Sequence, residues 1–267
     1  MIFVSVDNVI KRTRDAQVDF GKSSKGQTGD SGNDKRDDKT GAIHGALPLA
    51  EAFENRKAAS RAERYIAVMA RPTLDFWFEF ASTYSYPAAM RITPLAKASG
   101  VTLRWRPFVL GPIFNAQGWQ TSPFNLYPDK GRYMWRDLER ICNALDLPFV
   151  RPEPFPQNSL LAARVALIGF ADAWGENYCR AVYRAEFGEG RIISETATIA
   201  AILDDLGQDA EAVLRQAQSD EIKARLRAET EQAQKLGIFG APSFVTAGGE
   251  LFWGNDRLEA ALNWAAR

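Results

Sequence analysis

Histidine is almost absent from the 267-residue sequence, in which His44 is the only one. Nucleophile activation of the Ser-His-Asp or Cys-His kind needs an imidazole, and zinc sites are built from clusters of histidine and cysteine. His44 lies where the chain has its weakest structural pattern, so it supports neither chemistry. We therefore expect no metal site, and any catalysis must use hydroxyls, carboxylates, lysine, arginine, backbone groups or a bound cofactor.

Cysteine is scarce as well. Cys142 and Cys179 are the only two, both lie in segments with helical spacing, and the sequence contains no C-x-x-C pair. We expect two small buried thiols. Because thiol–disulfide exchange needs a protein thiolate, this pattern argues against a dithiol oxidoreductase.

The chain also lacks an excess of charge and a long apolar run. Lys+Arg and Asp+Glu both number 33, and the pI is about 6.6, so no overall field attracts nucleic acid or acidic membranes. The N-terminal segment lacks the apolar core of a secretion signal, and no stretch reaches the roughly 18 apolar residues of a membrane helix. We expect a cytoplasmic protein with no nucleic-acid and no membrane partner.

The first part of the chain differs in composition from the rest. Residues 21–40 contain no aliphatic or aromatic side chain, and all seven tryptophans lie after residue 76. Such a stretch cannot offset its ordering entropy by burial. We expect residues 1–72 to be a disordered extension, with the folded unit beginning near Met69, which is also a candidate translation start. A regulatory or tethering tail is the alternative.

From residue 73 onward the apolar spacing predicts an α/β protein. Residues 73–80 alternate as a strand, 86–100 have helical spacing and end at a glycine, and 101–110 alternate again. This order is typical of a βαβ unit.

The remainder of the chain predicts a helical insertion and a return to the sheet. Several helical segments follow, interrupted by a proline-rich connector at 148–156, and then a helix, a β-hairpin and a last helix from Asn255 to Ala266. We predict a thioredoxin-like fold made of 73–110 and 219–267, with an all-α domain at 111–218 inserted.

Three short motifs lie at the ends of these elements. The strand-to-helix corner "FEFASTYSYPA" (78–88) has Ser-x-x-Ser where redox proteins of the thioredoxin type have Cys-x-x-Cys. "GIFGAPSF" (237–244) precedes a strand, and "FWGNDRLE" (252–259) opens the last helix. In this order the motifs resemble the 2-hydroxychromene-2-carboxylate isomerases and the related kappa-class glutathione transferases, in the DsbA-like branch of the thioredoxin fold. The resemblance covers residues 73–266.

The resemblance implies that Ser82 is the catalytic serine, which orients and stabilises the sulfur of bound glutathione. A thiolate at a helix N-terminus beside hydroxyl and backbone donors has a lowered pKa, so the protein needs no cysteine of its own. Without a base Ser82 would be a poor nucleophile, and we interpret it as a thiolate stabiliser. Simple helix capping is the alternative for Ser82 and the main role expected of Ser85. Thr83 departs from the proline that is common in the family.

The Ala241-Pro242 pair is the second implied site. The resemblance implies a cis peptide here, and a backbone that binds the cysteinyl part of glutathione in the manner of an added strand. An ordinary trans proline at the start of a strand is the alternative.

Asn255 and Asp256 match the pair that holds the γ-glutamyl end of glutathione in the family. An aspartate suits its ammonium group, and helix N–H groups suit its carboxylate. An N-cap with a first-turn acid is the alternative, and both roles are compatible.

Lys130 matches a kappa-class lysine near the glycine carboxylate of glutathione or the second substrate, and a solvated lysine is the alternative. Trp119 stands where relatives often have asparagine, which removes one expected contact. Together with Phe114 and Phe124 it is a candidate wall of an aromatic substrate pocket, although such residues also serve as plain core.

The resemblance implies a glutathione-dependent cis–trans isomerase of 2-hydroxychromene-2-carboxylate or a similar aromatic 2-oxo-acid, acting by reversible addition of the glutathione thiolate. A kappa-class-like glutathione transferase or peroxidase is one alternative, since both reactions begin from the same thiolate. A thioredoxin-fold binding module without catalysis is the other. The expected partner is a small aromatic molecule, and the relatives imply a homodimer.

Overall fold

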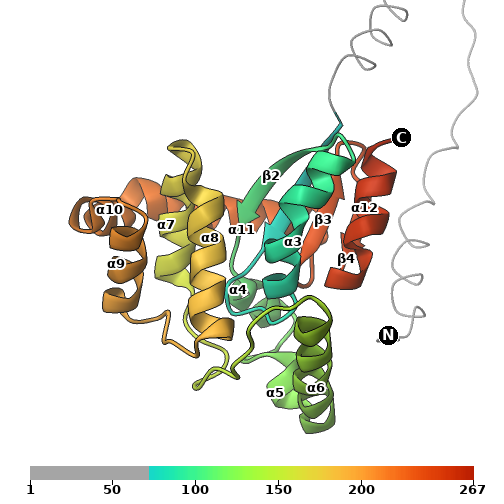
Figure 1. Ribbon diagram of the computed structural model, residues 1–267, viewed down its shortest axis with the longest axis horizontal. Coiled ribbons are helices and arrows are strands. Elements are labelled where there is room, and N and C mark those ends of the chain that lie inside the picture. The colour runs from blue at the N-terminus through green and yellow to red at the C-terminus, as the bar shows by residue number, and fades with distance from the viewer. Residues whose placement is uncertain (1–71) are drawn as a thin grey trace, which may run out of the picture. The chain divides into compact units, whose positions relative to one another are not determined.

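The structure is a computed structural model that describes residues 72–267 (Figure 1). The predicted extension, with His44 and Met69, lies outside the described residues apart from its last residue. In chain order the elements are β1 (Thr73–Phe78), α3 (Ser85–Ala98), β2 (Thr102–Pro107), α4 (Leu110–Ala116), α5 (Pro123–Leu126), α6 (Pro128–Ala144), α7 (Leu160–Ala171), α8 (Gly175–Tyr183), the π-helical segment η1 (Arg184–Gly188), α9 (Thr196–Asp205), α10 (Ala210–Ala217), α11 (Asp220–Lys235), β3 (Ser243–Thr246), β4 (Leu251–Trp253), the 3-10 turn η2 (Asn255–Arg257) and α12 (Leu258–Ala265).

A four-stranded mixed sheet has the order β2-β1-β3-β4. β1 and β2 are parallel, with Phe76 opposite Trp105, and α3 connects them as the predicted βαβ unit requires. β3 is antiparallel to β1 and pairs with β4 in the predicted hairpin. The order strand-helix-strand, helical block, helix-strand-strand-helix is therefore confirmed.

The sheet separates two apolar clusters, because successive side chains of a strand point to opposite faces. Phe76, Phe78 and Phe244 belong to the larger cluster, which is covered by α3, α7, α8 and α12. Trp77 and Val245 belong to the smaller cluster, which is covered by α4 and α11. Figure 1 shows α3 beside α12, and α7 with α8 on the β2 side of the sheet.

The larger cluster is continuous from the sheet into the helical block. Ala162 of α7 and Val182 of α8 are fully buried in the same cluster as Phe78. The block therefore packs directly on the sheet, and the domain boundaries proposed from the sequence stay a prediction.

Element ends differ from the prediction at three places. The second strand ends at Pro107 rather than at residue 110. The last helix begins with a 3-10 turn before its α-helical part at Leu258. The segment 177–190, whose apolar spacing predicts a helix, changes to π-helical winding at Arg184, and Glu186 is fully buried in this part. No helix among residues 72–267 is long and apolar enough to cross a membrane.

Candidate active site

The corner between β1 and α3 holds Ser82 through its backbone. The Ser82 N–H donates to the Glu79 carbonyl at 3.1 Å, and the Ser82 carbonyl accepts from the Ser85 N–H at 3.1 Å. α3 begins at Ser85, and no side chain caps its N-terminus. The expectation that Ser85 mainly caps the helix is therefore wrong, because Ser85 is the first helical residue and is buried.

The Ser82 side chain contacts the second motif. Its hydroxyl donates to the Ala241 carbonyl at 2.9 Å, across 159 residues of sequence. The Ala241-Pro242 peptide is cis, which confirms the geometry that the resemblance implied.

The second motif in turn contacts the third. The Gly254 N–H donates to the Pro242 carbonyl at 2.9 Å, and Asn255 follows directly. Gly254 has φ of 107°, a conformation that glycine adopts without the steric cost of a Cβ. Two hydrogen bonds thus connect all three motifs into one site.

Asn255 is held by an arginine that the sequence analysis missed. Arg91 of α3 donates from Nε and Nη2 to Asn255 Oδ1 at 3.2 and 3.1 Å, and from Nη2 to the Asn255 carbonyl at 2.7 Å. The same guanidinium forms an ion pair with Glu259 of α12. No sequence signal links these residues, because Arg91 lies far from the other two along the chain.

The remaining predicted site residues are exposed. Asp256 has 73% of its side chain exposed and lies 3.6 Å from Arg257. Lys130 is exposed in the first turn of α6, with its ammonium 4.7 Å from the centre of the Tyr127 ring. Asp256 adjoins Asn255 in sequence, whereas no described hydrogen bond or ion pair connects Lys130 with Ser82, so the role of Lys130 stays a prediction.

A second missed residue, Tyr84, connects the corner to α6. Its hydroxyl donates to Asp137 Oδ2 at 3.0 Å, and its ring lies 6.3 Å from that of Phe124. Burial, then the Asp137 carboxylate and more weakly Asp256, raise the pKa of Tyr84 well above its usual value. Tyr84 is therefore a neutral hydroxyl two residues from Ser82.

A buried acid lies three residues before Ser82. Glu79 is 6% exposed, and burial raises its pKa to about 7, although the Ser159 hydroxyl donates to its carboxylate. The Tyr183 hydroxyl donates to the Glu79 carbonyl at 2.9 Å. Glu186 is fully buried, and neither of its carboxylate oxygens has a hydrogen-bond partner among the described residues. Burial, and then the charge of Glu79, raise the pKa of Glu186 well above its usual value.

Cys142 and Cys179 are free and buried, as expected. Burial raises the pKa of Cys142 to about 11 and that of Cys179 well above its usual value. Neither thiol is available as a thiolate at neutral pH. Within residues 72–267 no group of three or more His, Cys, Asp or Glu side chains is placed to hold a metal ion.

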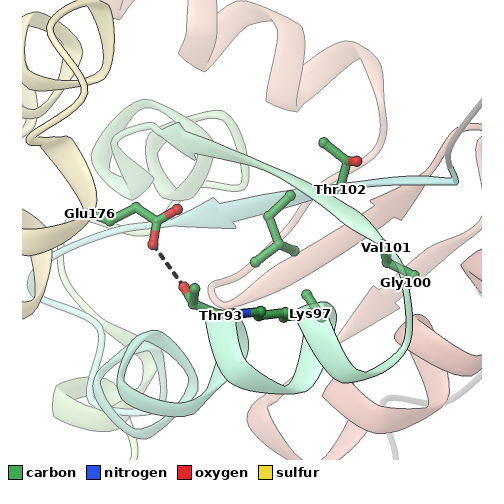
Figure 2. A pocket seen from close by; sticks show the side chains of 8 residues that line it. Thr93, Lys97, Gly100, Val101, Thr102 and Glu176 are labelled. Atoms are coloured by element: carbon green, nitrogen blue, oxygen red, sulfur yellow. Dashed lines mark hydrogen bonds between the residues drawn. The ribbon is translucent and has the colours of Figure 1, made fainter.

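A separate pocket lies at the other end of α3 from Ser82 (Figure 2). Its volume is about 370 Å³, and it lies between the last turns of α3, the start of β2 and Glu176 of α8. Thr93 donates to Glu176 at 2.8 Å across this pocket. It contains none of the predicted site residues.

Comparison with known proteins gives relatives for most of the described chain. Residues 73–263 match the family described as the DSBA-like thioredoxin domain. The 2-hydroxychromene-2-carboxylate isomerase of Sphingobium xenophagum is 30% identical over 188 residues, which is 70% of this chain and 94% of the relative. The corresponding protein of Pseudomonas putida is 32% identical over 190 residues, 69% of this chain and 90% of the relative.

Structural and more distant relatives agree with these matches. A solved structure of a 2-hydroxychromene-2-carboxylate isomerase superimposes with a TM-score of 0.66 and 29% identity, covering 73% of this chain and 96% of that one. Glutathione S-transferase kappa 1 of Homo sapiens is 24% identical over 200 residues, 70% of this chain and 88% of the relative.

Proposed function

Because this chain belongs to the DsbA-like thioredoxin family and within it to the 2-hydroxychromene-2-carboxylate isomerases, we propose that it is a glutathione-dependent cis–trans isomerase. The proposed substrate is 2-hydroxychromene-2-carboxylate or a similar aromatic 2-oxo-acid. The resemblance stated from the motifs and the thioredoxin-like fold class are thereby confirmed, and the family makes the chain an isomerase. The observation that carries the finer proposal is the 2.9 Å hydrogen bond from Ser82 to Ala241, which joins two motifs at the corner.

The residues at this corner have the donors and acceptors that glutathione requires. The backbone of Ala241 would hold its cysteinyl part, and Asn255 with Asp256 its γ-glutamyl end. An exposed carboxylate at Asp256 suits the ammonium group, and the side-chain amide of Asn255 suits the adjacent carboxylate. Lys130 is an exposed cation that suits the glycine carboxylate. When bound, glutathione would supply a thiolate that adds to a conjugated double bond, permits rotation and leaves unchanged.

The role of Ser82 follows from its having a single proton. A hydroxyl that donates to the Ala241 carbonyl cannot also donate to a sulfur. Ser82 must therefore turn its O–H away from Ala241 when it stabilises a thiolate. A peptide bound beside Ala241 as an added strand would compensate, because its N–H can donate to the vacated carbonyl.

Ser82 acts here as a hydrogen-bond donor and not as a nucleophile. None of the described residues is a histidine, and no hydrogen bond connects the Ser82 hydroxyl to a lysine or carboxylate in this part of the chain. A serine without such a base stays protonated at neutral pH.

A kappa-class-like glutathione transferase or peroxidase is the second candidate, supported by the 24% identity to the human kappa-class protein. The two functions need the same thiolate and differ in whether glutathione is consumed. A binding module without catalysis is disfavoured by membership in an isomerase family. A cytoplasmic location, a homodimeric state and the absence of a nucleic-acid partner remain predictions.

Absorbance kinetics with 2-hydroxychromene-2-carboxylate test the proposal. Turnover should require glutathione, and all of the added glutathione should be recovered unchanged. Consumption of one glutathione per turnover would instead establish a transferase. Binding is measured separately by thermal shift, where a ligand at 100 times its dissociation constant stabilises by about 2.7 kcal/mol.

Ser82→Ala should lower kcat about 100-fold or more, because it removes a donor that acts on developing negative charge. The protein should keep its fold, and Ser194→Ala on an exposed loop is the matched control. Wild-type turnover in the Ser82 variant would contradict the assignment.

A further inference from the structure

Arg91 is the only described side chain that hydrogen-bonds the Asn255 side chain. The contact joins α3 to the turn before α12, and these two helices lie side by side in Figure 1. Asn255 is 8% exposed, so protein partners largely determine the orientation of its side chain.

The chemistry of this contact fixes which end of the amide faces α3. Both Arg91 nitrogens are donors, so the atom that they contact must be the carbonyl oxygen Oδ1 and cannot be the amide nitrogen. The Asn255 Nδ2 group therefore points away from the guanidinium. It has no hydrogen-bond partner among residues 72–267, which leaves two N–H donors at the site.

We infer that Arg91 is a positioning residue, which holds the Asn255 amide so that Nδ2 donates to the γ-glutamyl carboxylate of glutathione. The inference rests on the proposed function, since it assigns a task within the same glutathione site. Arg91 does not need to touch glutathione to carry out this task.

Glu259 determines how Arg91 acts. It pairs with the guanidinium from the α12 side, at Nη1 and Nη2, while Nε and Nη2 face Asn255. The positive charge of Arg91 is thereby balanced within the protein. Arg91 is left to act through the geometry of its hydrogen bonds rather than as a free cation that attracts the ligand.

Lysine cannot replace this arrangement. The planar guanidinium donates to two oxygens of Asn255 and to Glu259 from fixed directions. An ammonium is a compact charge on a flexible chain, and it has only three donors without a fixed plane. Arg91→Lys should therefore keep the charge but lose part of the orientation of Asn255.

The experiment compares two ligands by calorimetric titration. Glutathione has the γ-glutamyl carboxylate, whereas cysteinylglycine lacks the whole γ-glutamyl group. Arg91→Met should weaken the binding of glutathione about tenfold, the loss expected for one hydrogen bond to a charged group. It should leave the binding of cysteinylglycine unchanged. Arg91→Lys should lie between wild type and Arg91→Met.

Two further variants separate positioning from general damage. Asn255→Ala combined with Arg91→Met should bind glutathione no more weakly than Asn255→Ala alone, because both substitutions remove the same interaction. Arg227→Met removes an exposed guanidinium on α11, away from the site, and is the matched control, with near wild-type affinity. In turnover, Arg91→Met should raise the KM for glutathione and leave kcat at saturating glutathione within twofold.

Several outcomes would overturn the inference. The first is wild-type affinity for glutathione in Arg91→Met. The second is an equal loss of affinity for glutathione and for cysteinylglycine. The third is a double variant, Arg91→Met with Asn255→Ala, whose loss of affinity equals the sum of the two single losses. If Arg91→Met does not fold, Arg91→Lys is judged by the same ligand pair. A wild-type protein that binds neither ligand would instead refute the proposed function, and this inference with it.

Discussion

Replacing Glu79 with glutamine should remove a loss of stability that the protein undergoes between acidic and neutral pH. Burial raises the pKa of Glu79 from the ordinary 4.5 to about 7 in the folded protein. In the unfolded chain the same carboxyl is solvated and loses its proton near pH 4.5. The two states therefore bind different numbers of protons over this interval.

The sign and size of the effect follow from that difference. Below pH 4.5 Glu79 is protonated in both states and its stabilising contribution is fully present. Between pH 4.5 and 7 only the unfolded state releases the proton, so the free energy of unfolding falls as pH rises, and the loss is complete above pH 7. At about 1.4 kcal/mol per pH unit, the interval from 4.5 to about 7 corresponds to about 3 kcal/mol.

The neighbours of Glu79 determine how cleanly the variant isolates this contribution. The Ser159 hydroxyl donates to the Glu79 carboxylate, and the Tyr183 hydroxyl donates to the Glu79 backbone carbonyl. A glutamine can accept both hydrogen bonds, the first at Oε1 and the second at the same backbone carbonyl. Glu186 is coupled to Glu79, so the two carboxyls titrate as a pair. In Glu79→Gln, Glu186 no longer has this negative neighbour, and the pH dependence that remains belongs to the other titrating groups, among them Glu186 and Glu229.

Equilibrium urea unfolding between pH 4.5 and 8, followed by tryptophan fluorescence at constant ionic strength, measures the effect. The difference in unfolding free energy, Glu79→Gln minus wild type, should grow by about 3 kcal/mol from pH 4.5 to 7.5. Glu231→Gln, an exposed position on α11, is the control and should follow the wild type at every pH. A Glu79→Gln difference that stays constant to within 1 kcal/mol would refute the reasoning.

Two further substitutions test neighbouring parts of the site. Ser159→Ala removes a hydroxyl that favours ionised Glu79, so it should raise the Glu79 pKa further and destabilise the protein by about 1–2 kcal/mol at pH 8. The same urea titration at pH 4.5 should show a smaller loss, and equal losses at both pH values would contradict this reason. Gly254→Ala places a Cβ 2.6 Å from Asp256 Oδ1 at a φ of 107°. It should cost about 1–3 kcal/mol and weaken glutathione binding in calorimetry, and an unchanged Tm would contradict the strain.

The sheet was predictable because its signals are local. The alternation at residues 73–80 and the glycines of the hairpin specify a strand and a turn without reference to the rest of the chain. The π-helical winding at Arg184–Gly188 was not predictable, because the apolar spacing of the preceding helix continues through it. One inserted residue changes the face on which Glu186 lies, and sequence periodicity does not resolve a change of that size.

The residues of the candidate site also divide into those that local motifs predict and those that only the tertiary fold reveals. Ser82, Ala241 and Pro242 were predicted from motifs, and the structure brings them together. Arg91 and Ser159 were missed because each acts on a partner distant in sequence, 164 and 80 residues away. An arginine on a helix and a serine before another helix are typical surface residues, and only the tertiary fold distinguishes them.

Glu79 was missed for another reason, which also explains its chemistry. In the alternating run the position between Phe78 and Phe80 is expected to face water when only one side of a sheet is covered. Here β1 ends at Phe78 and Glu79 lies in the corner that follows, where Ser159 before α7 and Tyr183 of α8 contact and enclose it. An enclosed carboxyl with a pKa of about 7 is mostly uncharged well below that pH, and it lies three residues before Ser82 in the sequence. A thiolate at the corner would therefore form with least electrostatic opposition while Glu79 is still protonated, and ionisation of Glu79 would oppose it.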